Sequence, residues 1–520
     1  MLRPRILRFC VLLACSLLSC SPSTSETPQP VVSPPIVSET SPSADPVSDP
    51  SPIVFRCGDS FPEDASSIRV VLDADELELL DRFPALASAD LTGSECAAEI
   101  LAWAQAHPLV SVRYTVSLGD DVVSNDADHA AVERVSDASP LAYLPSLRQL
   151  TVSEPMEPDT VIALLAARPD LDLRCAVQVC GKTIPIDAED LDASDLSRAD
   201  ADALAAAIPA LPHLYRISLR GASDWTLDDA DKLQRARDGL LVDYPTEAFG
   251  VSFSLADEVV SFSGVYLRER MDELRTLLPY LRNVKRLDME ECGVRDDVMA
   301  ALRAEFPNPK IVWRIHARLY SCRTDAIMIK FSNDIDSNRL YDSDTAALKY
   351  CNEVQYLDLG HNHITRMDFL NYMPEIRVLI IAVGYVTNIS GVENCKKLEY
   401  CEFLSGGIQD ISPLAACTEL RHLNLSFNLI QDITPLYGLK KLERLWISRN
   451  PIPEDQIETI KALLPDCTIN TTAVNPTGEG WRYLEDGTIA PRYAQLRDEF
   501  CYGRHIDSYT EETRPAPIGN

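Results

Sequence analysis

Apolar residues recur with a period of 22 in the last third of the chain, in the pattern apolar-x-x-apolar-x-apolar. A fixed period of this length is typical of a solenoid, in which each unit buries its apolar face only against its neighbours. The alternation at the end of each pattern predicts a half-buried strand. The pattern opens at five positions, which are Val354, Ile376, Leu398, Leu420 and Leu442.

A turn residue follows each predicted strand three positions later. An Asn there can satisfy backbone groups of the bend with its amide, and a Gly fits the bend sterically. Apolar residues at helical spacing come next, for example Ile433, Leu436 and Leu439. The predicted unit is therefore strand, turn and short helix. The turn residues are Asn362, Gly384, Gly406, Asn428 and Asn450.

The stretches LEYCEFLSGGIQDISPLAACTE and LRHLNLSFNLIQDITPLYGLKK resemble the leucine-rich repeat family, in its 22-residue bacterial subclass. The resemblance covers residues 352 to about 465. Its departures are Gly at two of the five Asn positions and an arc at 368–374 without the usual Pro. The resemblance implies an α/β fold, a right-handed solenoid with a curved parallel sheet and short helices or arcs on the convex side.

A weaker form of the same strand pattern runs upstream, at spacings of 61, 67 and 70 residues and then 70 more to Val354. Each long unit also contains an apolar helix and then a second strand, in 110–118, 171–179 and 310–319. We expect irregular strand-helix-strand repeats over 54–350 that share one core with the regular repeats of 351–475. The upstream openers are Leu86, Leu147, Leu214 and Val284.

The N-terminus predicts the compartment. Basic residues precede an apolar run at 9–18 that is typical of a secretory signal and is too short to span a membrane. Leu17-Leu18-Ser19-Cys20 then resembles a bacterial lipoprotein box, with 1–19 removed and lipid attached to Cys20; a competing box ends at Cys15 but leaves a very short apolar run. Residues 20–53 are rich in Ser and Pro and predict a disordered tether. We therefore expect an extracytoplasmic lipoprotein anchored to a membrane.

The charge and the motifs exclude several functions. A formal net charge of -31 argues against nucleic acid, because phosphate binding needs clustered Lys and Arg. His361-Asn362-His363 suggests a metal site, but Asn362 is a repeat Asn and no third ligand lies nearby. The chain also has no G-x-S-x-G, H-E-x-x-H or glycine-rich phosphate loop. We expect no enzyme activity, no cofactor and no metal.

Twelve cysteines follow Cys20. Four of them occupy repeat positions where other units have Met, Leu or Phe, which predicts small core residues: Cys351, Cys395, Cys401 and Cys417. Cys175 and Cys180 are the pair that differs most from this pattern, and no pair has C-x-x-C spacing. Export would permit disulfides, so the pattern leaves the disulfide content open.

The concave sheet is the predicted binding surface, because its strands present the residues between the buried positions in aligned columns. Aromatic and Arg side chains dominate binding hot spots, and an exposed strip of Val378, Ile380 and Tyr400 is unusual for solvent. The alternative is that the columns are ordinary strand residues covered by the C-terminal tail. The predicted ligand-binding residues are Tyr356, Asp358, Val378, Ile380, Tyr400, Glu402, His422, Asn424, Arg444 and Trp446.

The segment 476–520 departs from the repeat and contains a short amphipathic helix at 492–500, after a last strand within 466–475. We interpret it as a cap on the open end of the solenoid rather than as a docking motif. The sequence thus predicts a monomeric, lipid-anchored, non-enzymatic module that binds a protein ligand. The alternative is a glycan-binding or carbohydrate-processing envelope lipoprotein, because Tyr356 and Tyr400 lie beside Asp358 and Glu402.

Overall fold

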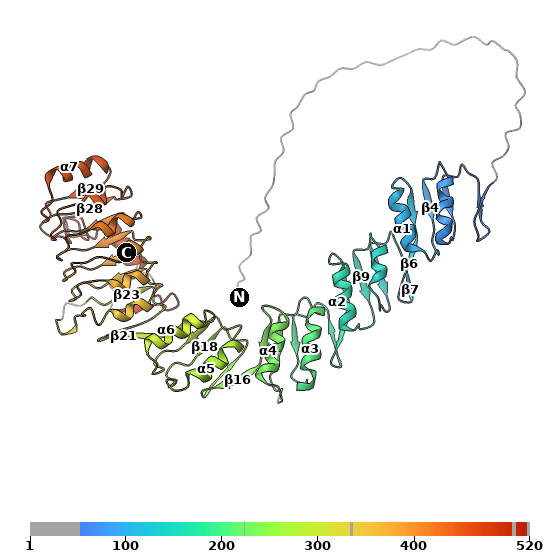
Figure 1. The fold of residues 1–520 in the computed structure, drawn as a ribbon, viewed down its shortest axis with the longest axis horizontal. Helices are drawn as coiled ribbons and strands as arrows, with labels where there is room; N and C mark the ends of the chain where they lie inside the picture. Colours follow the sequence, from blue (N-terminus) through green and yellow to red (C-terminus); the bar gives the residue numbers. More distant parts are fainter. Residues whose placement is uncertain (1–51, 223, 333–335, 502–505, 517–520) are drawn as a thin grey trace, which may run out of the picture.

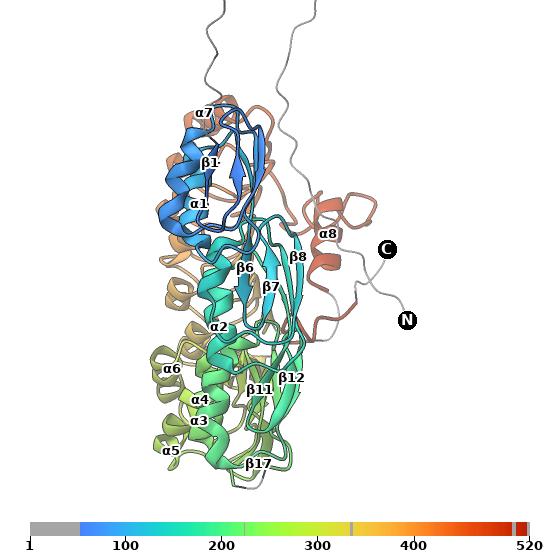
Figure 2. The ribbon, with the colours of Figure 1, turned by 90° about the vertical axis from the view of Figure 1, so that its right-hand side faces the viewer.

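The computed structural model describes residues 52–222, 224–332, 336–501 and 506–516. The predicted signal peptide, Cys20 and most of the predicted tether lie outside the described residues. The chain forms an open arc in which the elements follow one another in sequence order (Figure 1). The helices line one side of this arc and the strands line the other (Figure 2). This is the solenoid that the 22-residue pattern predicts.

Four long units make up the first half of the arc. Each unit has a parallel sheet of three strands followed by an antiparallel hairpin. The parallel strands are β3 (Ser67–Arg69), β4 (Ser88–Asp90), β5 (Ser111–Arg113), β8 (His129–Val132), β9 (Gln149–Val152), β10 (Asp172–Arg174), β13 (Asp190–Asp192), β14 (Arg216–Ser218), β15 (Leu241–Asp243), β18 (Val259–Ser261), β19 (Arg286–Asp288) and β20 (Lys310–Val312). The hairpins are β6 (Thr115–Leu118) with β7 (Asp121–Ser124), β11 (Ala176–Val179) with β12 (Lys182–Pro185), β16 (Pro245–Ala248) with β17 (Val251–Ser254), and β21 (Arg314–Ala317) with β22 (Tyr320–Arg323).

Helices connect the parallel strands and pack on the outer side of the sheets. The α-helices are α1 (Ala97–Ala106), α2 (Pro158–Ala167), α3 (Ala201–Ala207), α4 (Leu227–Ala236), α5 (Met271–Leu277) and α6 (Asp296–Glu305). The 3₁₀ helices are η1 (Ala74–Arg82), η2 (Ser139–Tyr143), η3 (Arg198–Asp200), η4 (Ile208–Ala210) and η5 (Leu278–Tyr280). A short hairpin of β1 (Ile53–Val54) and β2 (Ser60–Phe61) precedes them, and the ring of Phe55 stacks on Phe83 at 6.4 Å between centroids. The first open edge of the solenoid is therefore covered.

The hairpins are the part of the long unit that the sequence pattern does not predict. Each expected second strand breaks into two strands, the second of which leaves the parallel sheet. At the first break the main chain of Tyr114 pairs with the side chain of Asn125, at 2.9 Å from Tyr114 N to Asn125 Oδ1. Two-residue turns with positive φ close the hairpins, as at Cys180 and Gly181 with φ of 48° and 76°.

The regular repeats form one eight-stranded sheet. Seven strands are parallel: β23 (Met328–Lys330), β24 (Tyr356–Asp358), β25 (Val378–Ile380), β26 (Tyr400–Glu402), β27 (His422–Asn424), β28 (Arg444–Trp446) and β29 (Thr468–Asn470), and β30 (Ser508–Tyr509) runs antiparallel beside β23. The convex side consists of η7 (Ala346–Tyr350), η8 (Asp368–Tyr372), η9 (Val392–Asn394), η10 (Ser412–Ala416), η11 (Thr434–Leu436) and α7 (Glu454–Leu463). The short η6 (Asp336–Asn338) lies in the loop after β23, and α8 (Pro491–Glu499) belongs to the C-terminal segment.

The repeat Asn side chains point into the solenoid. Asn428 Nδ2 donates to the carbonyl oxygens of Phe403 at 2.6 Å and Leu425 at 3.0 Å, and its Oδ1 accepts from Ile408 N at 3.2 Å. One side chain thus satisfies the main chain of two successive repeats. Asn362 is bonded in the same way, and the described residues contain no group of three candidate metal ligands. The pair His361 and His363 therefore flanks a structural Asn.

A single cluster of buried apolar side chains runs from Ile53 to Leu464. The long units and the regular repeats therefore share one continuous core. Four cysteines at repeat core positions are buried in it: Cys351, Cys395, Cys401 and Cys417. The structure contains no disulfide bond among the cysteines of its described residues, and Cys175 and Cys180 lie at the start and tip of the second hairpin.

Candidate functional site

The predicted ligand-binding columns are aligned by the strand register, but they do not face solvent. Tyr356, Val378, Tyr400 and His422 stand opposite one another on β24 to β27, and the second column is aligned in the same way. Nine of the ten predicted residues are buried, and only Arg444 keeps partial exposure. The cause is the C-terminal segment 471–516, whose helix α8 lies on the strand side of the arc (Figure 2).

The C-terminal segment covers the columns with large aromatic side chains. The ring of Trp481 lies 5.4 Å from Tyr400 and 5.3 Å from Trp446 between centroids, and Phe500 lies 5.3 Å from Tyr356. These residues belong to a second apolar cluster, separate from the main core. The segment is therefore a cover on the concave face (Figure 2), and the prediction that it caps the open end of the solenoid is corrected. The apolar strip of Val378, Ile380 and Tyr400 is explained by this cover.

A buried carboxylate fixes the cover in place. Glu402 is fully buried and accepts hydrogen bonds from Trp481 Nε1 at 2.8 Å, from Arg482 Nε at 2.9 Å and from the Tyr400 hydroxyl. Arg482 Nη2 bonds the second oxygen, so the ion pair is bidentate. Burial opposes the charge of Arg482, but the attraction and hydrogen bonds of Glu402 outweigh it and raise the pKa of Arg482 well above its usual value.

Further ion pairs extend this contact along the face. Arg377 on the repeat side pairs with Glu399 and with Glu499 at the end of α8. Arg492 at the start of α8 pairs with Glu399 at 3.0 Å. The C-terminal segment therefore joins the sheet through a charge network as well as through aromatic packing.

The titratable residues of the columns behave as core residues. Burial, together with the charges of Arg444 and Arg492, lowers the pKa of His422 to about 3. Burial also raises the pKa of Tyr400 well above its usual value and raises the pKa of Asp358 against the hydrogen bond from Gly360 N. The concave face of the regular repeats thus forms a second core, and a macromolecule has no access to it while the C-terminal segment is in place.

A different surface of the regular repeats carries exposed apolar side chains. We call it the edge strip, and it consists of Tyr341, His363, Val383, Tyr385 and Leu429, which stand in the loops that follow the parallel strands. The exposed fractions are 45% for Tyr341, 46% for Val383, 58% for Tyr385 and 52% for Leu429. Single exposed apolar residues are ordinary, but their gathering along one edge is typical of a binding surface.

The edge strip is held in a fixed arrangement. The His363 ring makes T-shaped contacts with Tyr341 at 5.2 Å and with Tyr385 at 4.9 Å between centroids. Tyr341 and His363 also form a parallel backbone bridge, and the guanidinium of Arg318 lies 5.7 Å from the Tyr341 ring centre. An ordered aromatic surface of this kind loses little conformational entropy when it binds a partner.

Backbone strain marks the same edge. The third residue after each of the strands β24 to β28 takes a left-handed conformation, with φ of 56° to 62°. These residues are His361, Val383, Ser405, Phe427 and Arg449. This conformation is unfavourable for a β-branched residue such as Val383. The alternation along the strands does not predict the edge strip, because its residues lie in the loops after the strands. The available signal was the apolar or aromatic residue directly after the repeat Asn or Gly, where no core position explains it.

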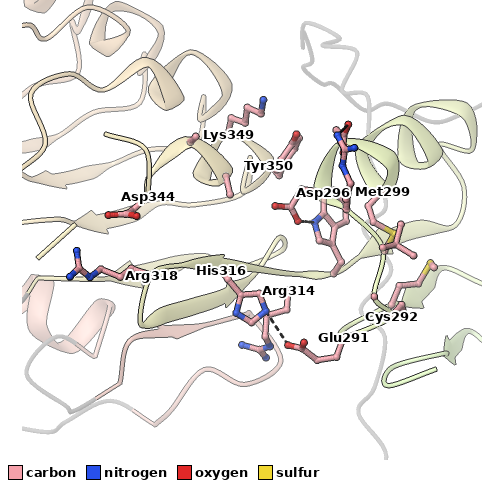
Figure 3. A pocket seen from close by; sticks show the side chains of 18 of the residues that line it. Glu291, Cys292, Asp296, Met299, Arg314, His316, Arg318, Asp344, Lys349 and Tyr350 are labelled. Atoms are coloured by element: carbon pink, nitrogen blue, oxygen red, sulfur yellow. Dashed lines mark hydrogen bonds and ion pairs between the residues drawn. The ribbon is translucent and has the colours of Figure 1, made fainter. Parts of the chain in front are cut away.

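A cavity lies where the long units meet the regular repeats. It has a volume of about 680 Å³, and Figure 3 shows Lys349 and Tyr350 on one side and His316 and Glu291 on the other. Two of its lining groups contact each other, since His316 Nε2 lies 3.2 Å from Glu291 Oε1. Burial raises the pKa of the Cys292 thiol to about 11, so this thiol is a poor nucleophile.

Comparison with known proteins identifies the repeats. Residues 418–462 match the family model described as leucine-rich repeats in two copies. The regular part of the chain therefore consists of leucine-rich repeats, as the 22-residue pattern predicts. No sequence among curated proteins matches this chain.

Several solved structures show a distant likeness. An internalin of Listeria monocytogenes is 18% identical, over 68% of this chain and 86% of its own, with a TM-score of 0.26. A leucine-rich repeat protein of Leptospira interrogans is 16% identical, over 75% of this chain and 91% of its own, with a TM-score of 0.26. Internalin C2 of Listeria monocytogenes is 22% identical, over 29% of this chain and 75% of its own, with a TM-score of 0.22. These TM-scores are too low to define a common path over whole chains.

Proposed function

We propose that this chain is a lipid-anchored, extracytoplasmic protein-binding module that acts without enzyme chemistry, and that the edge strip is its contact surface. Leucine-rich repeats suggest protein binding, because solenoids offer extended surfaces of regularly spaced side chains. The concave face, on which such binding would be expected, is occupied here by the C-terminal segment. The binding surface is therefore assigned to the loops at the edge of the sheet.

The observation that carries the proposal is the exposure of Tyr341 and Tyr385 beside His363 in one ordered aromatic row. Tyr supplies a large, rigid contact area with a polar end, and it is enriched at binding hot spots. Val383 and Leu429 extend the apolar area along the same edge. Within the described residues, no other segment of this chain buries the rings of Tyr341 and Tyr385.

The anchor part of the proposal rests on the N-terminal sequence. The run at 9–18 with its basic flank supports export, and Leu17-Leu18-Ser19-Cys20 supports lipid attachment at Cys20. Within the described residues, no helix is long and apolar enough to cross a membrane. A lipid and the Ser/Pro-rich tether of 20–53 would hold the solenoid at an extracytoplasmic surface.

The residues that suggested a glycan-binding site are not accessible in the structure. It depended on Tyr356 and Tyr400 beside Asp358 and Glu402, and all four side chains are buried beneath the C-terminal segment. A glycan site needs aromatic rings open to the ligand. No observation on the described residues favours this alternative over protein binding.

A site-specific crosslink tests the proposal. A photo-reactive amino acid replaces Tyr385 in the full chain within its native envelope, and a matched variant carries it at Tyr372, which is 56% exposed on the helical side. We expect a covalent adduct with one protein at position 385 and none at 372. No adduct at 385, or the same adducts at both positions, would contradict the assignment of the edge strip.

A further inference from the structure

Two buried thiols meet at the junction between the long units and the regular repeats. Cys322 lies on β22 of the last hairpin, and Cys351 is the residue that ends η7 on the convex side of the first regular repeat. Their sulfur atoms are 3.8 Å apart, and both side chains are fully buried. No other cysteine pair of the described residues has an Sγ–Sγ hydrogen bond among the contacts the structure shows.

We propose that Cys322 and Cys351 form a disulfide bond during folding, which covalently joins the two parts of the solenoid. A disulfide has a bond length of about 2.05 Å, so the two sulfur atoms need to approach each other by less than about 2 Å. The two thiols lose two protons and two electrons, and one S–S bond forms. The electrons pass to a disulfide oxidant, such as a protein dithiol oxidoreductase or oxidised glutathione, which is reduced to two thiols.

The position of the two cysteines explains what the bond would stabilise. The two cysteines are 29 residues apart in sequence, and the bond would close the loop that contains β23, η6 and η7. This loop includes the change from a unit with a hairpin to a unit without one. Repeat proteins are stabilised mainly between neighbours, so a junction between unlike units is where a crosslink adds most.

The environment of the two thiols indicates that the disulfide would form while the chain folds and not after folding is complete. Burial and the neighbouring Cys351 raise the pKa of the Cys322 thiol well above its usual value, so the thiolate that attacks a disulfide is scarce in the folded state. Full burial also keeps an oxidant away from both sulfurs. The bond would therefore be a structural link set once, and not a reversible sensor.

Cys395 and Cys417 are matched controls within the same chain. Both are buried, and their thiols donate to main-chain carbonyl oxygens of Met373 and Val392 at 3.8 and 3.3 Å. The thiol of Cys351 also contacts a carbonyl oxygen, that of Arg323 at 3.8 Å, so the difference between the two pairs is the sulfur–sulfur contact of Cys322 and Cys351. We expect the thiols of Cys395 and Cys417 to stay reduced under the same conditions.

The test is a refolding experiment on the full chain. Reduced, unfolded protein is refolded in a glutathione redox buffer, quenched, unfolded with an alkylating agent and digested for mass spectrometry. We expect a peptide pair linked through Cys322 and Cys351 that disappears on reduction, with Cys395 and Cys417 fully alkylated. Full alkylation of Cys322 and Cys351, or equal crosslinking of Cys395 with Cys417, would overturn the proposal.

A stability measurement supplies the second readout. In the wild-type chain refolded with the oxidant, adding a reductant to the unfolding buffer should lower the urea midpoint. In the double variant Cys322→Ala and Cys351→Ala the midpoint should be unchanged by the reductant. Equal midpoints for the wild-type chain with and without reductant would also overturn the proposal.

Discussion

Arg482 in the C-terminal segment reaches across 80 residues of sequence to bond both carboxylate oxygens of Glu402 on β26. The carboxylate is fully buried, and two further donors, Trp481 Nε1 and the Tyr400 hydroxyl, complete its hydrogen bonding. This pair is the point where the cover and the repeat sheet depend on each other. It turns the face that a solenoid usually offers to a ligand into a second core.

Removal of the arginine should destabilise the protein strongly. Arg482→Met leaves the Glu402 carboxylate buried without its counter-charge, and we expect the free energy of unfolding to fall by about 3–5 kcal/mol in urea titrations. The double variant with Glu402→Gln removes the charge and keeps an acceptor for Trp481, so it should lose less than the single variant. Lys441→Met in the exposed pair with Glu419 is the control, with a loss below about 1 kcal/mol. Equal losses for Arg482→Met and Lys441→Met would refute this role.

Acid should weaken the fold through His422. Its pKa is lowered from 6.5 to about 3 in the folded chain, so the unfolded chain binds the proton first as the pH falls. The stabilising effect of a neutral His422 is complete above pH 6.5 and is lost progressively toward pH 3. Between pH 7 and pH 5 this one group should cost about 2 kcal/mol, which the variant His422→Gln should not show. Urea midpoints of both proteins at the two pH values measure the difference; parallel losses would count against it.

The inward Asn should be irreplaceable. Asn428→Ala leaves the buried carbonyl oxygen of Phe403 and the Ile408 N–H without their partner, and we expect a loss of about 2–4 kcal/mol. The carbonyl oxygen of Leu425 loses one donor but keeps the bond from Asn450 Nδ2 at 2.9 Å. The exposed Asn394, which bonds only the Asn371 side chain, is the control and should cost less than about 1 kcal/mol when changed to Ala. Chemical denaturation decides between the two roles, since a tolerated Asn428→Ala would mean that the turn holds without its amide.

Substitution of a buried aromatic residue should lower stability, and substitution of an exposed one should lower binding. Trp481→Ala removes the largest side chain of the cover and should cost about 3–5 kcal/mol in unfolding free energy. Tyr385→Ala removes an exposed ring that contacts the ring of His363, and it should cost less than about 1.5 kcal/mol. With the photo-reactive residue placed at the neighbouring exposed Val383, Tyr385→Ala should abolish the crosslinked adduct in the native envelope. A variant of Tyr385 that unfolds the protein but leaves capture intact would reverse these assignments.

Periodic residues made the repeat fold predictable. The spacing from Val354 to Leu442, the Asn at 362, 428 and 450, and the last strand near 468 follow from local pattern alone. The hairpins of the long units were not predictable in this way. Their strands continue directly from β5, β10 and β20, so hydrophobic alternation does not show where the chain leaves the parallel sheet.

The candidate site was harder to predict for a physical reason. Columns such as Tyr356, Val378 and Tyr400 are apolar enough to bind a ligand or to be covered, and strand spacing does not distinguish these outcomes. The answer lies in Trp481 and Arg482, which are distant in sequence and carry no repeat signal. The edge strip contains residues with left-handed backbone, such as Val383. The spacing of apolar residues does not predict this backbone conformation.

Hydroxyl-radical labelling of individual tyrosines tests most directly whether the edge strip, and not the concave face, is the contact surface. In the purified full chain, Tyr385 and Tyr372 should be modified several times faster than the buried Tyr400. In the native envelope, Tyr385 should become protected while Tyr372 keeps its rate. Modification of Tyr400 as fast as Tyr385 in the purified chain, or an unchanged rate of Tyr385 in the envelope, would contradict the account.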